Sequence, residues 1–173
     1  MFIRGAETKM QDKEERKLST SLKEKELKLK FEELHESQEK IKESEKAYRA
    51  IFENTGTAMM IVEEDKTISL INSRFEEISG YTKDEIEGKI KWTIFVDQKD
   101  LQRMVSYNDE RWRSPDKVPS QYVFDFITRE SSVKPVQLSI GIIPGTKKAV
   151  VSLLDLTELV KMEDKIKESE RKY

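Results

Sequence analysis

The chain has 173 residues, of which 38% are charged and 36% are hydrophobic, and its formal net charge is −2. This length exceeds that of an ordinary single domain of ~100–150 residues, and the small charge with interspersed signs gives no long-range attraction to nucleic acid phosphates. The absence of cysteine excludes disulfides, thiolate nucleophiles and cysteine-ligated metals.

Nothing in the sequence indicates export or membrane insertion. There is no run of about 18 apolar residues, and the beginning MFIRGAETKMQDKEE lacks the apolar core of a signal peptide. We therefore expect a soluble, cytoplasmic protein that makes no direct membrane contact and has no nucleic acid partner.

Residues 7–49 are dense in Lys and Glu and contain no Pro or Gly, which predicts a long helix. Apolar or aromatic side chains recur on it every seven positions, at Leu27, Leu34, Ile41 and Tyr48. Phe31 extends this stripe, whereas Gln38 and Glu45 interrupt it, so it forms a weak coiled-coil seam. We interpret residues 1–47 as a coiled-coil-like connector with a disordered extreme N-terminus, and we expect a homodimer through such connectors.

A repeat links the two ends of the chain. The sequence EKIKESEKAY at 39–48 returns as DKIKESERKY at 164–173, an offset of 125 positions. The apolar register returns as well, in the pairs Leu34 and Leu159, Ile41 and Ile166, and Tyr48 and Tyr173. A duplicated connector explains both matches. We therefore expect a shorter connector helix over residues 157–173, and a parent protein in which such connectors alternate with domains.

Between the connectors, residues 48–89 predict a helix, two strands joined by a turn, and two short helices. A hydroxyl residue precedes a glutamate by three positions twice, at Ser73 and Glu76 and at Thr82 and Glu85. This is the spacing of a capping box, which begins a helix. Gly80 and Gly88 stand where left-handed C-terminal caps would end the two helices.

A third helix is expected from Asp97 to about Arg113, because Leu101, Met104 and Val105 share one face and Ser114-Pro115 ends it. Three strands are predicted after it, in QYVFDFIT at 121–128, VQLSIGI at 136–142 and AVVSLL at 149–154. Strands on both sides of a helical cluster favour an antiparallel sheet. The predicted fold class is therefore α+β, with a five-stranded antiparallel sheet, short helices on one face, and flanking helices that are long at the N-terminus and shorter at the C-terminus.

Several ordered motifs of this middle region resemble the PAS family. They are INSRFEEISGYTKDEIEGK at 71–89, then W-x-x-F-V-x-x-x-D at Trp92, Phe95, Val96 and Asp100, and finally IPGTKKAVVSLLDLTE at 143–158. Within the first motif the matching positions are Asn72, Phe75, Gly80, Tyr81, Glu85 and Gly88. The resemblance implies a PAS domain over residues 48–156, of the kind found in multi-PAS sensor histidine kinases of two-component systems, with helices enclosing a small cavity.

The chain departs from the family pattern at two turns. Glu64-Asp65-Lys66 and Arg129-Glu130-Ser131-Ser132 stand where the family usually has a glycine. Tight two-residue hairpin turns are disfavoured without glycine. We therefore expect longer loops or type I turns at both places.

The resemblance also bears on cofactors. Flavin photochemistry in the family uses a cysteine, which is missing here, and haem is commonly held by a histidine beside the pocket. The chain has one histidine, His35, and it lies in the N-terminal connector. Haem ligation by Met104 or Tyr107 is chemically conceivable, but a methionine on an apolar helix face is more often part of the core. No cofactor and no metal site is expected.

Two other kinds of chemistry would involve His35. Leu34-His35-Glu36 faintly resembles the phospho-accepting helix of sensor kinases, but a solvated histidine is the favoured interpretation because the chain has no Gly-rich phosphate loop. A zinc H-E-x-x-H motif fails because Glu39 occupies its last position. The chain is not expected to be an enzyme, although its parent protein is expected to be a histidine kinase.

Two groups of candidate functional residues remain. An apolar cavity for an unidentified small ligand would be lined by Met104, Tyr122, Phe124, Phe126, Leu138 and Ile140. The alternative is that these side chains fill the core. At the end of the domain, Asp155 and Glu158 have capping-box spacing, with Thr157 as a competing cap.

These two groups suggest a function. Asp155, Thr157 and Glu158 would join the last strand rigidly to the C-terminal helix, so that a change in the core moves that helix. We interpret the chain as a sensory or signal-relaying module of a multidomain signalling protein, next to further PAS or kinase domains. The alternative is a structural dimerisation spacer with a filled core and no ligand.

Overall fold

The computed structural model describes residues 3–171. The predicted disorder of the extreme N-terminus and the last position of the repeat, Tyr173, concern residues outside this range. The chain divides into two compact units, residues 1–50 and residues 51–173. No helix among the described residues is long and apolar enough to cross a membrane.

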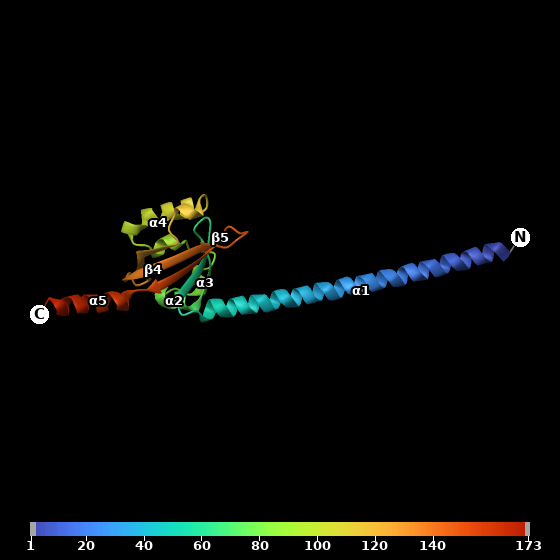
Figure 1. The fold of residues 1–173 in the computed structure, drawn as a ribbon, viewed down its shortest axis with the longest axis horizontal. Helices are drawn as coiled ribbons and strands as arrows, with labels where there is room; N and C mark the ends of the chain where they lie inside the picture. Colours follow the sequence, from blue (N-terminus) through green and yellow to red (C-terminus); the bar gives the residue numbers. More distant parts are fainter. Residues whose placement is uncertain (1–2, 172–173) are drawn as a thin grey trace. The chain divides into compact units, whose positions relative to one another are not determined.

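The predicted N-terminal helix is present as α1 (Ile3–Asn54), a single helix of 52 residues (Figure 1). Ion pairs at i and i+4 spacing lie along it, between Glu26 and Lys30 and between Glu36 and Lys40, both at 2.9 Å. Such pairs stabilise a helix modestly. α1 also exposes large apolar side chains, namely Leu18, Leu22, Leu27, Leu29, Phe31, Leu34, Ile41, Tyr48 and Ile51. This helix therefore offers a surface for interaction with a partner.

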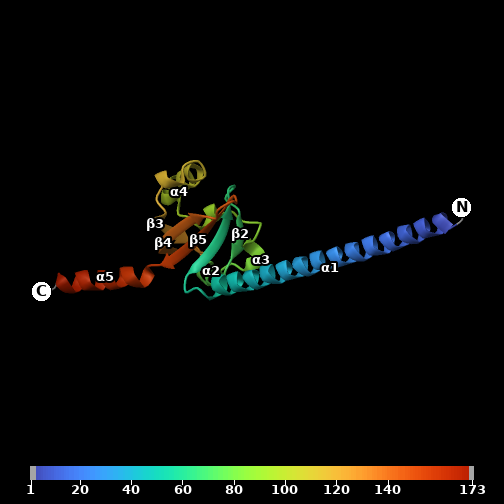
Figure 2. The ribbon, with the colours of Figure 1, turned by 45° about the vertical axis from the view of Figure 1, so that its right-hand side comes forward.

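The second unit contains the predicted five-stranded sheet, and every neighbouring pair of strands is antiparallel (Figures 1 and 2). The strands lie in the order β2-β1-β5-β4-β3. Their bounds are β1 (Ala58–Glu63), β2 (Ile68–Ile71), β3 (Gln121–Ile127), β4 (Val133–Ile142) and β5 (Lys148–Asp155). The α+β fold class is confirmed.

Five helices connect β2 to β3, and one more follows the last strand. They are α2 (Ser73–Ser79), α3 (Lys83–Ile86), the 3₁₀ helix η1 (Trp92–Phe95), α4 (Gln98–Arg111), the 3₁₀ helix η2 (Pro115–Lys117) and α5 (Thr157–Glu170). Alternate strand residues form one buried face, namely Met60, Val62, Phe124, Phe126, Val136, Leu138, Ala149, Val151 and Leu153. Helical residues pack on that face, among them Phe75, Ile86, Phe95 and Met104. The core therefore lies between one face of the sheet and the helices.

The glycine and threonine caps are where the sequence predicts them. Gly80 ends α2 with φ 77°, in the left-handed region, and Gly88 has φ 70° just after α3. Thr82 begins α3 with a capping box, in which its amide donates to the carboxylate of Glu85 at 2.9 Å. The end of α2 and the start of α3 therefore follow from local signals.

The capping box predicted at Ser73 and Glu76 is wrong. Asn72 is the N-cap of α2, and its side-chain oxygen accepts from the amide of Phe75 at 3.0 Å. Ser73 is the first helical residue, and its hydroxyl donates instead to the carboxylate of Glu53 at 2.8 Å. Both residue types cap helices well, and contacts from distant segments decide between them here.

The W-x-x-F-V-x-x-x-D motif joins α4 to the sheet. Asp97 caps α4 as predicted, by accepting from the amide of Lys99 at 3.0 Å, although α4 ends at Arg111, slightly before the predicted end. Asp100 accepts from the backbone amide of Asp125 on β3 at 3.0 Å and from Arg103 at 2.6 Å. The last residue of the motif thereby fixes the start of α4 against β3.

Both turns without glycine are longer than two residues, as predicted. In the first, the amide of Glu63 donates to the carbonyl oxygen of Thr67 at 2.8 Å, and Lys66 takes a left-handed φ of 79°. In the second, the amide of Thr128 donates to the carbonyl oxygen of Ser132 at 2.9 Å, and Ser131 has φ 62°. In each turn a residue with a side chain occupies a conformation that favours glycine.

Candidate functional site

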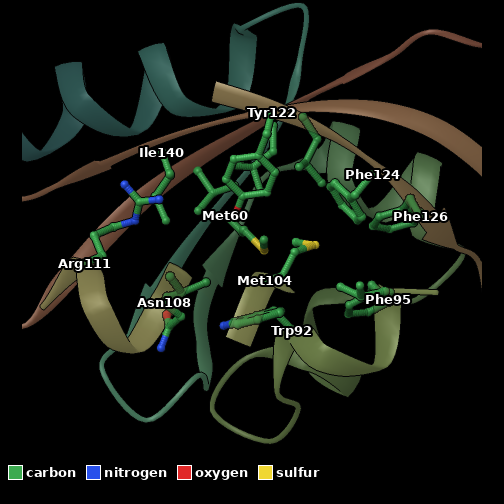
Figure 3. A pocket seen from close by; sticks show the side chains of 15 residues that line it. Met60, Trp92, Phe95, Met104, Asn108, Arg111, Tyr122, Phe124, Phe126 and Ile140 are labelled. Carbon is green, nitrogen blue, oxygen red and sulfur yellow. The ribbon is translucent and has the colours of Figure 1, made fainter. Parts of the chain in front are cut away.

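A small cavity of about 30 Å³ lies inside the core, between the buried face of the sheet and the helices η1 and α4 (Figure 3). All six residues predicted to line a pocket contribute to its wall, namely Met104, Tyr122, Phe124, Phe126, Leu138 and Ile140. The prediction that they bind a ligand stays a prediction. A cavity of this volume holds roughly one or two water molecules, so most of the space between these side chains is filled.

One side of the cavity is aromatic. The ring of Phe95 stacks on that of Phe126 with centroids 5.3 Å apart, and Phe75 packs edge-on against Phe95 at 5.4 Å. Such pairs contribute about 0.5–1.5 kcal/mol beyond the area they bury. This side of the cavity is therefore well packed.

Two methionine side chains lie in the middle of the group that lines the cavity. Met60 extends from β1 and Met104 from α4, and Figure 3 shows their thioether ends pointing toward each other. Both residues are buried. Because methionine is unbranched and adapts its shape readily, these two side chains are the part of the wall most easily displaced.

The opposite side of the cavity carries three polar side chains, Asn108 and Arg111 on α4 and Tyr122 on β3. Asn108 and Arg111 are 6% and 4% exposed, respectively. Nη2 of Arg111 donates to the carbonyl oxygen of Pro119 at 2.8 Å, whereas its Nε is buried without a partner among the described residues. Burial raises the pKa of the Tyr122 hydroxyl, although the positive charge of Arg111 opposes this shift. The cavity is therefore polar at this side.

Sequence reasoning missed Asn108 and Arg111. Both follow Met104 at i+4 and i+7, so the helical spacing that placed Met104 on the inner face also places them there. Their burial is not predicted from sequence because α4 is rich in charged residues, and an arginine in such a segment is usually solvated. The other residues missed, Met60, Val62, Trp92, Phe95, Val96, Val151 and Leu153, are apolar.

The residues considered for haem and metal chemistry lie in different surroundings. Met104 points into the small cavity, and the ring of Tyr107 packs against that of Tyr122 at 5.3 Å. His35 is exposed on α1 and stacks on Phe31, with ring centroids 6.5 Å apart. Among the side chains that the structure describes, no three metal-ligating groups form a cluster.

The junction between β5 and α5 is built around Asp155. One carboxylate oxygen accepts from the amide and the hydroxyl of Thr157, and the other accepts from Nζ of Lys134 on β4 at 3.0 Å. The next amide, that of Leu156, donates to the carbonyl oxygen of Pro135 on β4 at 2.9 Å. The first turn of α5 is therefore bonded to both of the last two strands.

The capping box predicted at Asp155 and Glu158 is wrong. Leu156 is the N-cap of α5, and Glu158 forms an exposed ion pair with Lys161 one turn further on, at 2.9 Å. Asp155 instead accepts hydrogen bonds from Thr157. A bond from an aspartate side chain to the backbone two residues later is an Asx turn. Thr157 takes part in the junction as a donor and does not cap the helix.

A second junction, between the last turn of α1 and the rest of residues 51–173, was not predicted. The side chain of Asn72 is fully buried and donates to the carbonyl oxygens of Phe52 and Thr57 at 2.9 and 3.0 Å. Nearby, the carboxylate of Glu53 accepts from Lys83 on α3. The hydrogen bond from Lys83 holds the pKa of Glu53 below its usual range, although burial opposes this shift. The last turn of α1 is thereby bonded to α3 and to the start of α2.

A five-stranded antiparallel sheet with helices on one face, and a small cavity between them, defines this part of the chain as an α+β module. Residues 46–115 match the family model of the PAS domain. The chain therefore contains a PAS domain, and this region belongs to the PAS family. No curated protein matches the sequence significantly.

Solved structures share the fold at low sequence identity. The PAS domain of an HTR-like protein from Haloarcula marismortui is 20% identical with a TM-score of 0.52, over 69% of this chain and 98% of that chain. A domain of the sensory box sensor histidine kinase/response regulator from Geobacter sulfurreducens is 21% identical with a TM-score of 0.56, over 65% and 94% of the two chains. The RpfR quorum-sensing receptor PAS domain from Cronobacter turicensis, solved in complex with C12:0, is 17% identical with a TM-score of 0.50, over 60% and 97%.

Proposed function

We propose that the chain is a sensory or signal-relaying PAS module of a multidomain signal-transduction protein, and that it passes conformational change through α5. The observation that carries this proposal is the Asp155 junction, in which the first turn of α5 is bonded to both β4 and β5. The module itself is not an enzyme. A sensor histidine kinase is the proposed parent, a class to which the Geobacter sulfurreducens protein belongs by name.

A short path connects the cavity to α5. Leu138 lines the cavity, and Val136, two residues before it on β4, pairs with Asp155 on β5. Because buried strands move as units, a shift of the cavity wall at β4 displaces the carbonyl oxygen and the ammonium group that hold the first turn of α5. The core and α5 are therefore expected to change together.

The proposed partner is a second copy of the chain, bound through the helical connectors. On α5, the exposed side chains of Leu159, Met162 and Ile166 follow one another at spacings of three and four. This is the spacing of a coiled-coil seam. A rotation of α5 would change which side chains meet in the dimer, and the signal would leave the module in this form.

The coupling is tested by amide hydrogen exchange over residues 157–170 of the full chain. Met104→Ala disturbs the cavity, and the double variant Asp155→Ala/Thr157→Ala disturbs the junction. We expect Met104→Ala to change the exchange of the α5 amides several-fold when the junction is intact, and to leave it unaltered when the junction is removed. In the parent protein, the double variant is expected to fold and to lose its response.

A matched control is Glu163→Ala, which removes an exposed carboxylate from the middle of α5. It should leave the response of α5 to Met104→Ala intact. If α5 responds equally with and without the junction, or if the parent protein signals normally with the double variant, the proposed coupling through Asp155 and Thr157 is wrong. Glu158 is proposed to support the same turn through its pair with Lys161.

The alternative function, a structural dimerisation spacer, is favoured by one observation. The cavity of about 30 Å³ leaves the core nearly filled, as expected for a domain that binds no ligand. In a spacer, Met104→Ala would destabilise the fold without changing the exchange of α5 relative to the rest of the domain. The same experiment therefore separates the two functions.

A further inference from the structure

The charge of Arg111 is buried in the core and has no carboxylate partner among the side chains that the structure describes. Arg111 is 4% exposed, and its partners are neutral: Nη2 donates to the carbonyl oxygen of Pro119 at 2.8 Å, and the side chain also hydrogen-bonds the hydroxyl of Tyr122. An unpaired buried charge is unfavourable, and a guanidinium cannot lose its proton to avoid this. A ligand that supplies the missing negative charge would resolve this arrangement.

A second arginine on the same helix shows the contrast. Arg103 donates to the carboxylate of Asp100 at 2.6 Å and to the carbonyl oxygen of Val123 at 3.0 Å. It is also less deeply buried than Arg111. The helix therefore provides a counter-ion for its more exposed arginine and none for the one that lines the cavity.

The donors left at Arg111 have the geometry of a carboxylate site. Nε carries one hydrogen without a partner, and Nη2 carries two, of which its bond to Pro119 uses one. These two nitrogens form one edge of the guanidinium, which binds both oxygens of a carboxylate. Asn108, one turn earlier, is also buried, and its side-chain amide donates to the carboxylate of Asp109 over a long distance of 3.4 Å.

We propose that this cavity binds a small organic carboxylate, with Arg111 holding the carboxylate and the apolar wall holding a short aliphatic tail. Figure 3 shows the guanidinium at the edge of the group of side chains that line the cavity, with the two methionines and the aromatic rings beyond it. The rest of the wall is apolar apart from Asn108 and Tyr122. One end of the site therefore suits an anion and the other suits a hydrocarbon.

The tail takes the place of methionine side chains. The present cavity of about 30 Å³ is too small for an aliphatic chain. The side chains of Met60 and Met104, which lie in the middle of the group that lines it, are flexible and can be displaced. Their displacement moves β1 and α4 apart. The inference rests on the proposed function in this respect, because the displacement would be the event that the module relays to α5.

The test uses the 173-residue chain near pH 7, with butanoate, hexanoate and octanoate, and with the alcohols of the same lengths as uncharged probes. Calorimetric titration and thermal unfolding measure binding. We expect at least one carboxylate to bind at least tenfold more tightly than its alcohol and to raise the Tm in a concentration-dependent way. Arg111→Gln, which removes the charge, is expected to weaken carboxylate binding at least tenfold and to leave alcohol binding unchanged.

Arg113→Gln is the matched control, because Arg113 lies two residues away on the surface and should not affect binding. If Arg111→Gln does not fold, the comparison of carboxylates with alcohols in the unsubstituted chain and the variant Arg111→Lys decide the question. Lysine keeps the charge and loses the paired donors, so carboxylate binding should weaken without vanishing.

The proposal is overturned if no carboxylate binds, if the alcohols bind as tightly, or if Arg111→Gln binds carboxylates as the unsubstituted chain does. This result is separate from the proposed relay function. Binding is measured at the cavity, whereas the relay is measured by the effect of the Asp155 junction on α5, and either test can fail while the other succeeds.

Discussion

The side-chain amide of Asn72 donates to the backbone carbonyl oxygen of Phe52 at 2.9 Å and thereby holds the last turn of α1 at the start of α2. The side-chain oxygen of Asn72 accepts from the amides of Met59 on β1 at 2.8 Å and Phe75 on α2 at 3.0 Å. One fully buried side chain therefore satisfies the backbone of three segments. Because Met60, the next residue on β1, lines the cavity, Asn72 connects Phe52 to a strand of the cavity wall within residues 51–173.

Asn72→Ala should lower the free energy of unfolding by about 3–5 kcal/mol, because it leaves several buried backbone groups unpaired at ~1–3 kcal/mol each. Urea unfolding followed by tryptophan fluorescence measures this loss. Asn108→Ala is the matched control, since Asn108 is also buried but its side-chain amide makes only a long contact of 3.4 Å with Asp109 among the described residues. A loss of about 1 kcal/mol is expected there, and equal losses for the two variants would contradict the proposed role of Asn72.

The Asp155 junction is expected to depend on pH. Burial raises the pKa of Asp155, but the hydrogen bonds from Thr157 and Lys134 outweigh it and hold the pKa below its usual value of 3.8. A lowered pKa in the folded state means that the carboxylate stabilises the fold above that value, and that this contribution is lost as the pH falls below it. Asp155→Asn should therefore be less stable than the unsubstituted chain at neutral pH, and the difference should shrink in acid.

Urea unfolding of both proteins between about pH 7 and pH 3 measures this difference. Taking the difference between the two proteins removes the contribution of carboxyl groups elsewhere in the chain. Glu163→Gln, on the exposed side of α5, should show no comparable trend. A stability difference between Asp155→Asn and the unsubstituted chain that stays constant over this range would mean that ionised Asp155 does not hold the junction.

Local signals predicted the elements of this fold well, but they did not identify the residues that join them. Thr82 and Gly80 act on their own neighbours in sequence, so their roles follow from spacing. Asn72 and Ser73 are both good caps, and Asn72 takes this position because its partners Phe52 and Met59 come from 20 and 13 positions away. Such contacts do not appear in a local pattern.

In the candidate site, too, local patterns predicted some residues, whereas contacts between distant segments determine the others. Its apolar wall was predicted from alternation along β3 and β4, where buried residues such as Phe124 and Leu138 recur at every second position. Arg111 was not predicted, because a charged residue on an amphipathic helix is normally assigned to solvent. Its burial depends on the carbonyl oxygen of Pro119, which only the folded chain brings within reach.

The α1 surface allows a test of the proposed dimer. Leu34 and Ile41 lie seven residues apart and are 59% and 58% exposed, so Leu34→Glu/Ile41→Glu should place repelling charges in the proposed seam. Sedimentation at micromolar concentration is expected to show a dimer for the unsubstituted chain and mainly monomer for the variant. Leu29→Glu is the matched control, because Leu29 is equally exposed but lies off this seven-residue register. A monomeric unsubstituted chain, or equal effects of both changes, would count against the seam.

The two turns without glycine contain strain that a single substitution should relieve. Ser131 is exposed and has φ 62°, a conformation that is unfavourable for any residue with a side chain. Ser131→Gly should therefore raise the free energy of unfolding, by about 0.5–1 kcal/mol once the greater freedom of glycine in the unfolded chain is included. Thermal and urea unfolding both measure this gain.

Lys66 tests whether the gain comes from the backbone. It has φ 79°, but its ammonium group also pairs with Asp109 at 2.8 Å. Lys66→Gly relieves the same strain and removes this partly exposed pair, which is worth at most about 1 kcal/mol. A smaller gain than for Ser131→Gly is therefore expected, and Lys66→Ala, which removes the pair and keeps the strain, should be destabilising. If Ser131→Gly lowers the stability, the left-handed backbone at this turn is not strained, and the serine side chain must stabilise it instead.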